Sequence, residues 1–438
     1  MRESPLYVFL DRYFGQILCF LFGFLPLIER KLRKYFSFNQ DVNSKSKKVL
    51  IVEFFEMGSS MMAYHGLLEL SKKIGKNNLY CLCSTTTKSS WVLIDIIPKE
   101  NIYAIPSNTF SSFVLGFFST IWKVRANSFD AIIDFGPLTR ISALAATLIK
   151  SEHLSGFCNE GGEGYFRGFH YDRLVPYSQN HHAVYNFLTL MRVGSGEDPE
   201  KVLKHEYVFE EIATAKYTSR DEIKEVVLKK LKEFLKSPQA DTTPLFLLGP
   251  DVGANLPQRN YPKSGYVSLI QKLLKTYPNA AVIFIGTKEN EQYCQDLVRV
   301  IADARVINFC GRTATLEELL ELFYLGTMYI GNDNGLQHFA SMTTVPFISF
   351  FGVETPGVYG PLGNGMTIFQ NFVCSPCVTM LNHKSTKCSN NLCLSTIPVE
   401  NIMQSIDMIF QGKGRARTIN NRDSYLYERE IKIISAKL

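Results

Sequence analysis

The sequence predicts an α/β protein built from two doubly wound, Rossmann-like domains. Short, continuous apolar runs alternate with helical stretches, which is typical of a parallel sheet covered by helices on both faces. The pattern occurs twice along the chain, and 438 residues are long for one domain but sufficient for two, each with its own core. With 46% hydrophobic and 20% charged residues, the composition is that of a folded globular protein.

The prediction of two doubly wound domains rests on ten predicted strands, five in each half of the chain. In the first half they are 49–55, 79–84, 101–106, 130–136 and 153–158, and in the second half 244–250, 280–286, 305–311, 327–333 and 346–352. A charged helix followed by a polar loop separates the halves, and we place the hinge there. The predicted segments are a membrane-associating segment at 1–47, a first domain at 48–215, a linker at 216–243, a second domain at 244–412 and a basic tail at 413–438.

Residues 13–28 carry no charge, and a basic segment follows them directly. Between Glu29 and Lys48 seven basic residues stand against two acidic ones, so this segment supplies +5 of the formal net charge of +6. The sixteen uncharged residues are fewer than the roughly 20 that a helix needs to cross a bilayer. We expect the segment to lie in the interface of an anionic cytoplasmic leaflet. The alternatives are a signal peptide, against which the position of the charges argues, and a hydrophobic helix packed on the protein's own surface.

The ten cysteines do not form the pattern of a disulfide scaffold. Several lie in or beside apolar runs, where a reduced cysteine behaves as a small hydrophobic residue, so a reducing compartment fits best. Four others form two pairs, Cys374 with Cys377 and Cys388 with Cys393, whose spacing suits one tetrahedral, structural zinc ion without a catalytic role. His383 lies between the pairs as a substitute ligand, and the alternatives are reduced thiols or a disulfide pair.

The strand end richest in polar residues is YIGNDNGLQHFASM. The strand stops at Asp333, the chain turns through Asn334 and Gly335, and a helix begins toward His338. Backbone N–H groups at a helix start bind phosphate, and Gly335 lets the phosphate approach closely. The Asp333 carboxylate repels phosphate and is suited to accept hydrogen bonds from sugar hydroxyls, whereas His338 could donate to a phosphate oxygen. The alternative is an ordinary Asp-Asn-Gly turn with a histidine in the core.

Two further strand ends contribute to this candidate site. The stretch 247–262 carries Gly253, Asn255 and Arg259, and a guanidinium here can neutralise a diphosphate by bidentate contact. Glu291 follows the next strand, where acidic residues often hold ribose hydroxyls. Because ligands of doubly wound sheets bind at the carboxyl ends of the strands, these residues predict a nucleotide site. The alternative for Arg259 is a solvated loop charge.

Four motifs occur in order along the second half of the chain: G-A-x(4)-R-x-Y-P, I-G-x(4)-E, G-R-T-x-T-L-x-E-L and G-N-D-N-G-x-x-H-x-A. In this order they resemble glycosyltransferase family 9, the heptosyltransferases of lipopolysaccharide core synthesis. The first half is similar to that family in FDAIIDFGPLTRISALAA and NHHAVYNFLTLMRVG, so the resemblance covers roughly residues 48–411. It implies a GT-B fold and an inverting, metal-independent transferase that uses a nucleotide-activated sugar, usually ADP-heptose.

The resemblance assigns roles by position. It implies that Asp333 and Gly335 contact the sugar and the diphosphate of the donor, with His338 beside them. Arg259 stands where the family usually has a lysine facing the phosphates, and Glu291 lies near the family's nucleotide-holding glutamate. The second domain would then bind the donor and the first domain the acceptor.

The resemblance also gives a role to the stretch VLIVEFFEMGSSMMAYHG, which predicts a buried strand, a turn at Gly58 and a helix. In the family this strand ends in a Gly-Asp pair whose aspartate deprotonates the acceptor hydroxyl, and here the pair is Gly58-Ser59. Because serine cannot accept the proton without a partner, we expect Glu56 to be the base, with His65 and Glu53 as further candidates. The alternative is that Glu56 only caps or solvates the turn.

Two functions remain open. The first is a glycosyltransferase that builds a cell-envelope glycan or the lipopolysaccharide core at the inner face of the cytoplasmic membrane. The second is a catalytically inactive relative that binds a sugar nucleotide or glycan there. The donor motifs favour the enzyme, and Ser59 in place of aspartate favours the inactive binder. The expected partners are a nucleotide-diphosphate sugar, a glycan or glycolipid acceptor and an anionic membrane surface, without nucleic acid and without a catalytic cofactor.

Overall fold

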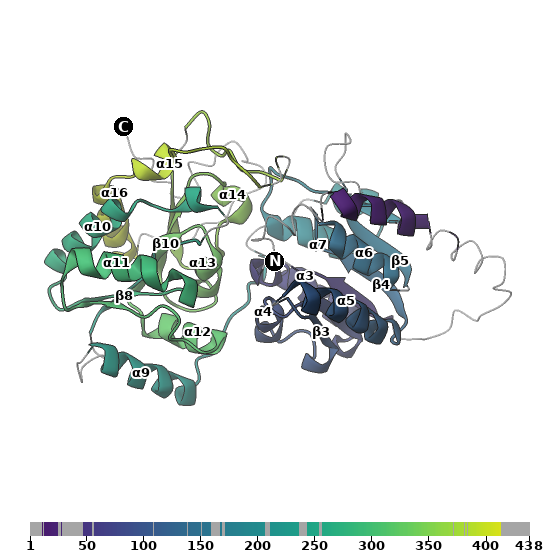
Figure 1. The fold of residues 1–438 in the computed structure, drawn as a ribbon, viewed down its shortest axis with the longest axis horizontal. Coiled ribbons are helices and arrows are strands. Elements are labelled where there is room, and N and C mark those ends of the chain that lie inside the picture. Colours follow the sequence, from purple (N-terminus) through teal and green to yellow (C-terminus); the bar gives the residue numbers. More distant parts are fainter. Residues whose placement is uncertain are drawn as a thin grey trace. The chain divides into compact units, whose positions relative to one another are not determined.

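The computed structural model describes Asp11 and the residues 13–24, 28, 47–54, 57–107, 109–137, 139–149, 151–158, 167–168, 171–205, 211–235, 243–253, 256–370, 372–380, 382 and 384–412. The chain divides into two compact units (Figure 1). The first comprises residues 1–179 and 183–207, and the second comprises 180–182 and 208–438. Helix α9 (Asp221–Leu235), in the predicted linker, belongs to the second unit, where Lys230 Nζ lies 2.7 Å from Glu318 Oε2.

A six-stranded, parallel sheet forms the centre of the first unit. Its strands are β1 (Val49–Val52), β2 (Leu79–Ser84), β3 (Ile102–Ile105), β4 (Phe129–Asp134), β5 (Ser151–Cys158) and β6 (Arg173–Pro176), in the order β3-β2-β1-β4-β5-β6. The helices of this unit are α2 (Met57–Met62), α3 (Tyr64–Ile74), α4 (Lys88–Leu93), α5 (Phe110–Arg125), α6 (Arg140–Leu148), α7 (Ala183–Gly194) and α8 (Pro199–Leu203).

The second unit has the same architecture. Its strands are β7 (Leu245–Gly249), β8 (Ala281–Phe284), β9 (Val306–Asn308), β10 (Met328–Asn332), β11 (Phe347–Phe351) and β12 (Gly365–Phe369), in the order β12-β11-β10-β7-β8-β9. Besides α9, its helices are α10 (Lys263–Thr276), α11 (Glu291–Ile301), α12 (Leu316–Leu325), α13 (Gly335–Ala340), α14 (Pro356–Tyr359), α15 (Leu392–Ser395) and α16 (Val399–Phe410).

The two sheets share one strand order, which confirms the predicted fold class. In each, the first strand is central, the second and third lie on one side, and the fourth to sixth lie on the other. This is the doubly wound order, and its chain connections reverse direction between the first and fourth strands. Ten of the strands were predicted. The other two, β6 and β12, are edge strands: RLVP has only two adjacent apolar residues between an arginine and a proline, and GMTIF has a threonine among its apolar residues.

The central strands are apolar along their whole length because both faces of each sheet are covered. All four residues of β1 (VLIV) and all five of β7 (LFLLG) are buried. Full burial of a Val, Leu or Ile side chain stabilises the fold by about 1.5–3 kcal/mol. Each of these strands therefore stabilises the core of its own unit and fixes the position of the loop at its carboxyl end.

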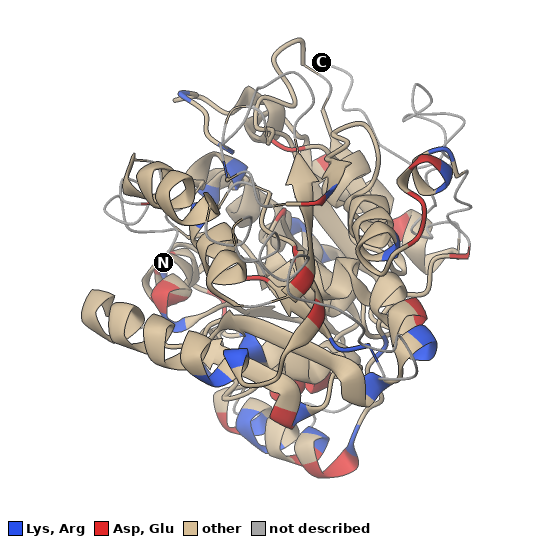
Figure 2. Cartoon of the chain, turned by 90° about the vertical axis from the view of Figure 1, so that its right-hand side faces the viewer, with Lys and Arg blue, Asp and Glu red and all other residues tan. Residues whose placement is uncertain are grey.

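The helical residues 13–24 pack on the surface of the first unit. Asp11 Oδ1 accepts hydrogen bonds of 2.9 Å from the backbone N–H groups of Arg140 and Ile141 at the start of α6. Leu18 and Phe22 pack against the core, whereas large apolar side chains on the other face of this helix are exposed. Residues 13–24 carry no charge, and Figure 2 shows where the charged residues of the described chain lie. Among the described residues, no helix is both long enough and apolar enough to cross a membrane.

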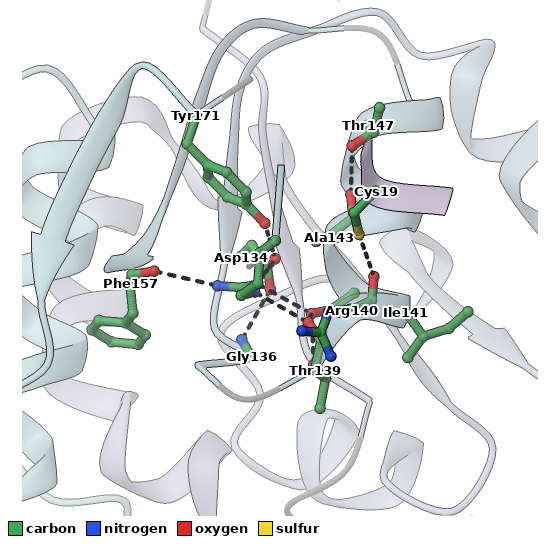
Figure 3. Close-up of polar contacts among 12 residues, drawn as sticks. Cys19, Asp134, Gly136, Thr139, Arg140, Ile141, Ala143, Thr147, Phe157 and Tyr171 are labelled. Atoms are coloured by element: carbon green, nitrogen blue, oxygen red, sulfur yellow. Dashed lines mark hydrogen bonds and ion pairs between the residues drawn. The ribbon is translucent and has the colours of Figure 1, made fainter. Parts of the chain in front are cut away.

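A buried polar network closes the carboxyl end of β4 (Figure 3). Asp134 accepts hydrogen bonds from the Tyr171 hydroxyl at 2.5 Å and from the Gly136 backbone at 2.9 Å, and it pairs with the guanidinium of Arg167. The Nε of Arg167 also donates to the Thr139 carbonyl at 3.1 Å. Burial raises the pKa of Tyr171 well above its usual value, so the phenol stays protonated and donates a hydrogen bond to Asp134. The network ties the chain around residues 167–171 to the end of β4.

We expect Asp134→Asn to destabilise the protein by about 3–5 kcal/mol, because the amide leaves the buried Arg167 charge without a counter-ion. Urea unfolding measures this change. Asp95→Asn, at an exposed position of the same unit, is the control and should shift the midpoint little. An Asp134→Asn protein with the parent's midpoint would contradict the importance of the network.

Candidate functional site

The candidate site lies where β7 and β10 end side by side in the second unit. The two strands pair in parallel, with Gly249 opposite Gly331, so the loops that follow them start next to each other. The loop after β7 carries Gly253 and Arg259, and β10 leads into Asp333 and helix α13. These are the first and fourth strands of the sheet, so this is the point where ligands bind in doubly wound folds.

Arg259 and Asp333, predicted from separate motifs, lie together at this point. Arg259 Nη1 is 3.9 Å from Asp333 Oδ2 and 3.4 Å from Glu354 Oε2. Lys384 adds a second cation, with its Nζ 3.7 Å from Glu354 Oε1 and 4.5 Å from the ring centroid of Tyr359. The site therefore holds two carboxylates and two cations.

The electrostatics of this cluster favour the protonated form of Asp333. Burial, and then the neighbouring Glu354 carboxylate, raise the pKa of Asp333 to about 7, although Arg259 and Lys384 oppose the shift. At neutral pH this carboxyl group is therefore protonated part of the time. Its repulsion of a phosphate is weakened, and in its neutral form it can donate a hydrogen bond as well as accept one.

Arg259 has donor capacity that the protein does not use. Its side chain is 23% exposed, yet its Nε is buried and has no hydrogen-bond acceptor among the described residues. A buried donor without an acceptor is unfavourable, and an anionic oxygen would satisfy it. Arg259 ends a short 3₁₀ helix (Pro257–Arg259), which begins with a proline.

A polar network fixes the loop that carries Arg259. Asn332, the last residue of β10, accepts a hydrogen bond of 2.9 Å from the Tyr261 backbone and donates one of 2.9 Å to the Pro250 carbonyl. Asp251 accepts from the Gly253 backbone at 3.1 Å and from Asn290 at 2.9 Å. Gly253 has a φ of +77°, which favours glycine. The loop is therefore tied to two neighbouring strand ends.

The residues after Asp333 take defined roles in the local structure. The Asn334 side chain caps α13 by accepting a hydrogen bond of 2.9 Å from the Leu336 backbone. Gln337 holds Asp333 by donating to its Oδ1 at 2.9 Å. A Cβ atom on Gly335 would meet only the ring edge of Phe339 at 4.0 Å, so the backbone here is open to a close approach. His338 lies one turn into the helix and is buried.

Glu291 is not joined to the cluster. Its carboxylate pairs with Lys288 and with Arg312 at 3.2 Å, and the hydrogen bond from Lys288 lowers its pKa. Among the described residues, no hydrogen bond or ion pair links Glu291 to Asp333 or Arg259. A role for it in holding a ribose stays a prediction, and Asn255 lies outside the described residues.

The first unit holds the candidates for the catalytic base. Helix α2 begins at Met57, so Gly58 and Ser59 lie in its first turn, and the prediction of a turn at Gly58 is wrong because this glycine is helical. Ser59 is buried, and Glu56 lies outside the described residues. His65 Nε2 lies 3.2 Å from Glu69 Oε1.

Glu53, the third candidate for the base, follows β1 directly. Its side chain is only 4% exposed, and its backbone N–H donates to the Leu82 carbonyl at 3.0 Å. A base must reach the acceptor oxygen, so the burial of Glu53 makes it a less accessible candidate than a residue on the surface of the loop.

The four paired cysteines are free thiols of different exposure. Cys374 is exposed, Cys377 and Cys388 are half-buried, and Cys393 is buried in the core. Burial first, and then the other three cysteines, raise the pKa of Cys393 to about 11. In the described part of the chain, no three His, Cys, Asp or Glu side chains are arranged to hold a metal ion. His383 lies outside that part, and the structural zinc stays a prediction.

The sequence reasoning missed two members of the cluster. Glu354 follows β11 by three residues, in FFGVETPG, so the rule that picked out Asp333 at the end of β10 could have found it. Lys384 stands in a loop between the cysteine pairs, far from any strand end. No signal in the sequence places its ammonium group beside Glu354.

Three solved glycosyltransferase structures share this fold. ADP-heptose lipopolysaccharide heptosyltransferase II of Escherichia coli matches with a TM-score of 0.63 and 14% identity over 84% of this chain and 99% of that chain. A glycosyltransferase family 9 protein of Veillonella parvula matches with a TM-score of 0.64 and 12% identity, covering 85% and 100%. The E. coli heptosyltransferase WaaC with ADP matches with a TM-score of 0.55 and 16% identity, covering 83% and 99%.

At these identities the likeness shows the fold, which is that of the heptosyltransferases. The family itself follows from the sequence model of glycosyltransferase family 9 (heptosyltransferase), which matches residues 118–387. The chain therefore belongs to glycosyltransferase family 9, as its motifs had indicated. No curated protein sequence matches it significantly.

The raised pKa of Asp333 predicts a dependence of stability on pH. Because its folded pKa of about 7 exceeds the ordinary 3.8, the folded state holds this proton more tightly, and ionisation destabilises the fold as the pH rises. Between about pH 4 and about pH 7, the parent should lose about 2–4 kcal/mol more of its unfolding free energy than Asp333→Asn does. Urea unfolding at both pH values measures the difference.

Asp303→Asn is the matched control for this measurement. Hydrogen bonds from Arg305 lower the pKa of Asp303, so its ionised form stabilises the fold. Because this contribution is gained mostly below the ordinary pKa of 3.8, the difference in stability between the parent and Asp303→Asn should change little over the same rise in pH. If the parent lost no more stability than Asp333→Asn between these two pH values, the raised pKa assigned to Asp333 would be wrong.

Proposed function

We propose that this protein is an inverting glycosyltransferase that needs no metal ion for catalysis. It moves a heptose-like sugar from a nucleotide-diphosphate donor to a cell-envelope glycan or to the lipopolysaccharide core. Family membership supports sugar transfer. The observation that carries the proposal is the meeting of Arg259 with Asp333 at the ends of β7 and β10, where a cation and a sugar-binding carboxylate stand together.

The donor diphosphate would bind to Arg259. Its buried Nε lacks an acceptor, and its ion pairs of 3.4 Å and 3.9 Å are longer than direct charge-assisted hydrogen bonds. The guanidinium can therefore turn toward phosphate oxygens without losing a strong contact. Lys384, on the other side of Glu354, supplies further positive charge. Gly253 and Gly335 leave the backbone open beside these cations.

Asp333 would hold the hydroxyls of the transferred sugar. Gln337 fixes its Oδ1, which leaves Oδ2 on the side of Arg259 and of the diphosphate. His338 and Asn334 lie on the same short helix and complete the donor side. Glu291 and Asn255 are proposed to contact the nucleoside.

The acceptor side would lie in the first unit, at the loop between β1 and α2. A single inverting displacement needs a base that takes the proton of the acceptor hydroxyl. Glu56 is our candidate because it stands in this loop, next to the Gly58-Ser59 pair that replaces the Gly-Asp pair to which the resemblance assigns this role. His65 is the next candidate, since its ring is held by Glu69.

A second candidate function is binding without transfer. It is favoured by Ser59, which is only 3% exposed, lies inside α2 and cannot by itself take the proton of an acceptor hydroxyl as an aspartate can. A relative of this kind would keep the donor site and bind a sugar nucleotide or glycan. The same sequence segment 1–47 would hold either form at the inner face of the cytoplasmic membrane, through its apolar run and its basic residues.

We expect Arg259→Ala, Asp333→Ala and His338→Ala each to weaken nucleotide-sugar binding while the protein stays folded. Arg259→Ala should have the largest effect on diphosphate ligands, because a hydrogen bond to a charged group contributes about 1.5–3 kcal/mol. A thermal-shift screen of nucleotide sugars and free nucleoside diphosphates measures the binding. Arg299→Ala, on the exposed surface of α11, is the control. Unchanged diphosphate binding by Arg259→Ala would show that the site is misplaced.

The identity of the base is tested with Glu56→Gln and Ser59→Asp. If Glu56 is the base, Glu56→Gln should lower turnover by about 10²–10⁴-fold with nearly unchanged donor affinity, because the amide cannot take a proton. A silent Glu56→Gln together with a gain of transfer in Ser59→Asp would make the natural protein a weak enzyme or a binder. Activity that neither change affects would point to His65.

A further inference from the structure

Helix α5 has an apolar outer face. Leu115 is 73% exposed, Phe118 61% and Trp122 77%, and Phe110 at the start of the helix is 47% exposed. Leu115, Phe118 and Trp122 follow one another at spacings of three and four residues, so they form a stripe along one side of the helix. Four large apolar side chains in water on one helix are unusual for a folded protein.

The opposite face of α5 is buried in the core of the first unit. Phe113, Phe117, Ile121 and Val124 pack there against strands of the sheet and against α6. A surface helix of a water-soluble domain places polar residues on its outer face. Since α5 is apolar on both faces, its outer face fits contact with something other than water.

The charges of α5 restrict what that contact can be. The stretch SNTFSSFVLGFFSTIWKVRANSF, which contains the helix, has no acidic residue, and its two basic residues, Lys123 and Arg125, stand in the last turn next to Trp122. A tryptophan beside basic residues is typical of the level of lipid headgroups, where its ring lies between the apolar and the polar region.

A second apolar surface belongs to the same side of the first unit. Leu18 and Phe22 of the N-terminal helix pack against the same core cluster as Phe113 and Phe117 of α5. That helix exposes six large apolar side chains, namely Tyr13, Phe14, Ile17, Phe20, Leu21 and Phe24. The sequence continues from it into the segment Glu29–Lys48 with its charge of +5.

From these observations we infer that the outer face of α5 is a second membrane-binding element, which lies on an anionic lipid surface together with the N-terminal helix. Two apolar helices, the absence of acidic residues on α5 and the neighbouring basic segment complement a negatively charged, apolar layer. This inference extends the membrane association proposed above for residues 1–47, and it is independent of the donor site.

The two tryptophans of the chain allow a direct test. Trp91 is fully buried and Trp122 is 77% exposed, so Trp91→Phe leaves one tryptophan at the proposed contact. Vesicles of phosphatidylglycerol and phosphatidylcholine should shift the emission of this full-length variant to shorter wavelength, and vesicles of phosphatidylcholine alone should do so less. The matched variant Trp122→Phe, which keeps only the buried tryptophan, should show no shift. An unshifted Trp122 emission in the presence of bound vesicles would overturn the inference.

Sedimentation with the same vesicles separates the two membrane elements. Leu115→Ser, Phe118→Ser and Trp122→Ser together should lower vesicle binding about tenfold or more, because three large apolar side chains no longer enter the lipid. The control combines Val226→Ser and Val300→Ser, which are exposed apolar positions of the second unit. Ile17→Ser and Leu21→Ser together, at exposed positions of the N-terminal helix, test that helix separately without removing its contacts with the core.

Each outcome of this experiment has one meaning. Full binding by the triple α5 variant and weak binding by the Ile17→Ser, Leu21→Ser variant would overturn the role of α5 but keep that of the N-terminal helix. Loss of binding in both supports the inference. If the parent self-associates without lipid and the triple variant is monomeric, the face is an interface between copies of this chain, and the inference is wrong.

Discussion

The structure depends on one topological constraint: in each parallel sheet, strands are added on one side of the first strand and then, from the fourth strand on, on its other side. Because strands are added to one side of β7 and then to the other, the loops after β7 and β10 lead to opposite faces of the sheet, and the point between them is where ligands bind in doubly wound folds. Polar residues of both loops meet at this point. The charged cluster of the second unit follows from this geometry and not from nearness in the sequence.

Charged residues lie at the carboxyl end of the fourth strand in both units, but their partners differ. In the first unit, Asp134 at the end of β4 is neutralised by Arg167 and accepts two further hydrogen bonds, so its carboxylate is satisfied by the protein itself. In the second unit, the ion pairs of Arg259 are long and its Nε has no acceptor in the described part of the chain. A satisfied network holds a fold together, whereas an incomplete one is suited to receive a charged ligand.

The sequence allowed the fold and half of this cluster to be predicted, for a physical reason. Fully buried strands such as β1 and β7 are continuous apolar runs, and Asp333 stands at the end of such a run, so both are local patterns. Lys384 and the pair of Asp134 with Arg167 depend on contacts between distant parts of the chain. The outer face of α5 could not be predicted either, because an apolar residue in a helix has the same sequence pattern whether it faces the core or the surface.

In the proposed donor site, the second carboxylate offers a reason for the arginine at position 259, where the resemblance leads one to expect a lysine. Nη1 of Arg259 faces both Asp333 and Glu354, while its Nε has no acceptor among the described residues. A guanidinium has donors on separate edges, so it can keep its carboxylate partners on one edge and bind phosphate with the other. An ammonium group is a single point charge, which Glu354 would compete for directly. We therefore expect the arginine at position 259 to depend on the presence of Glu354. The positive charge of Lys384 balances the negative charge that Glu354 adds.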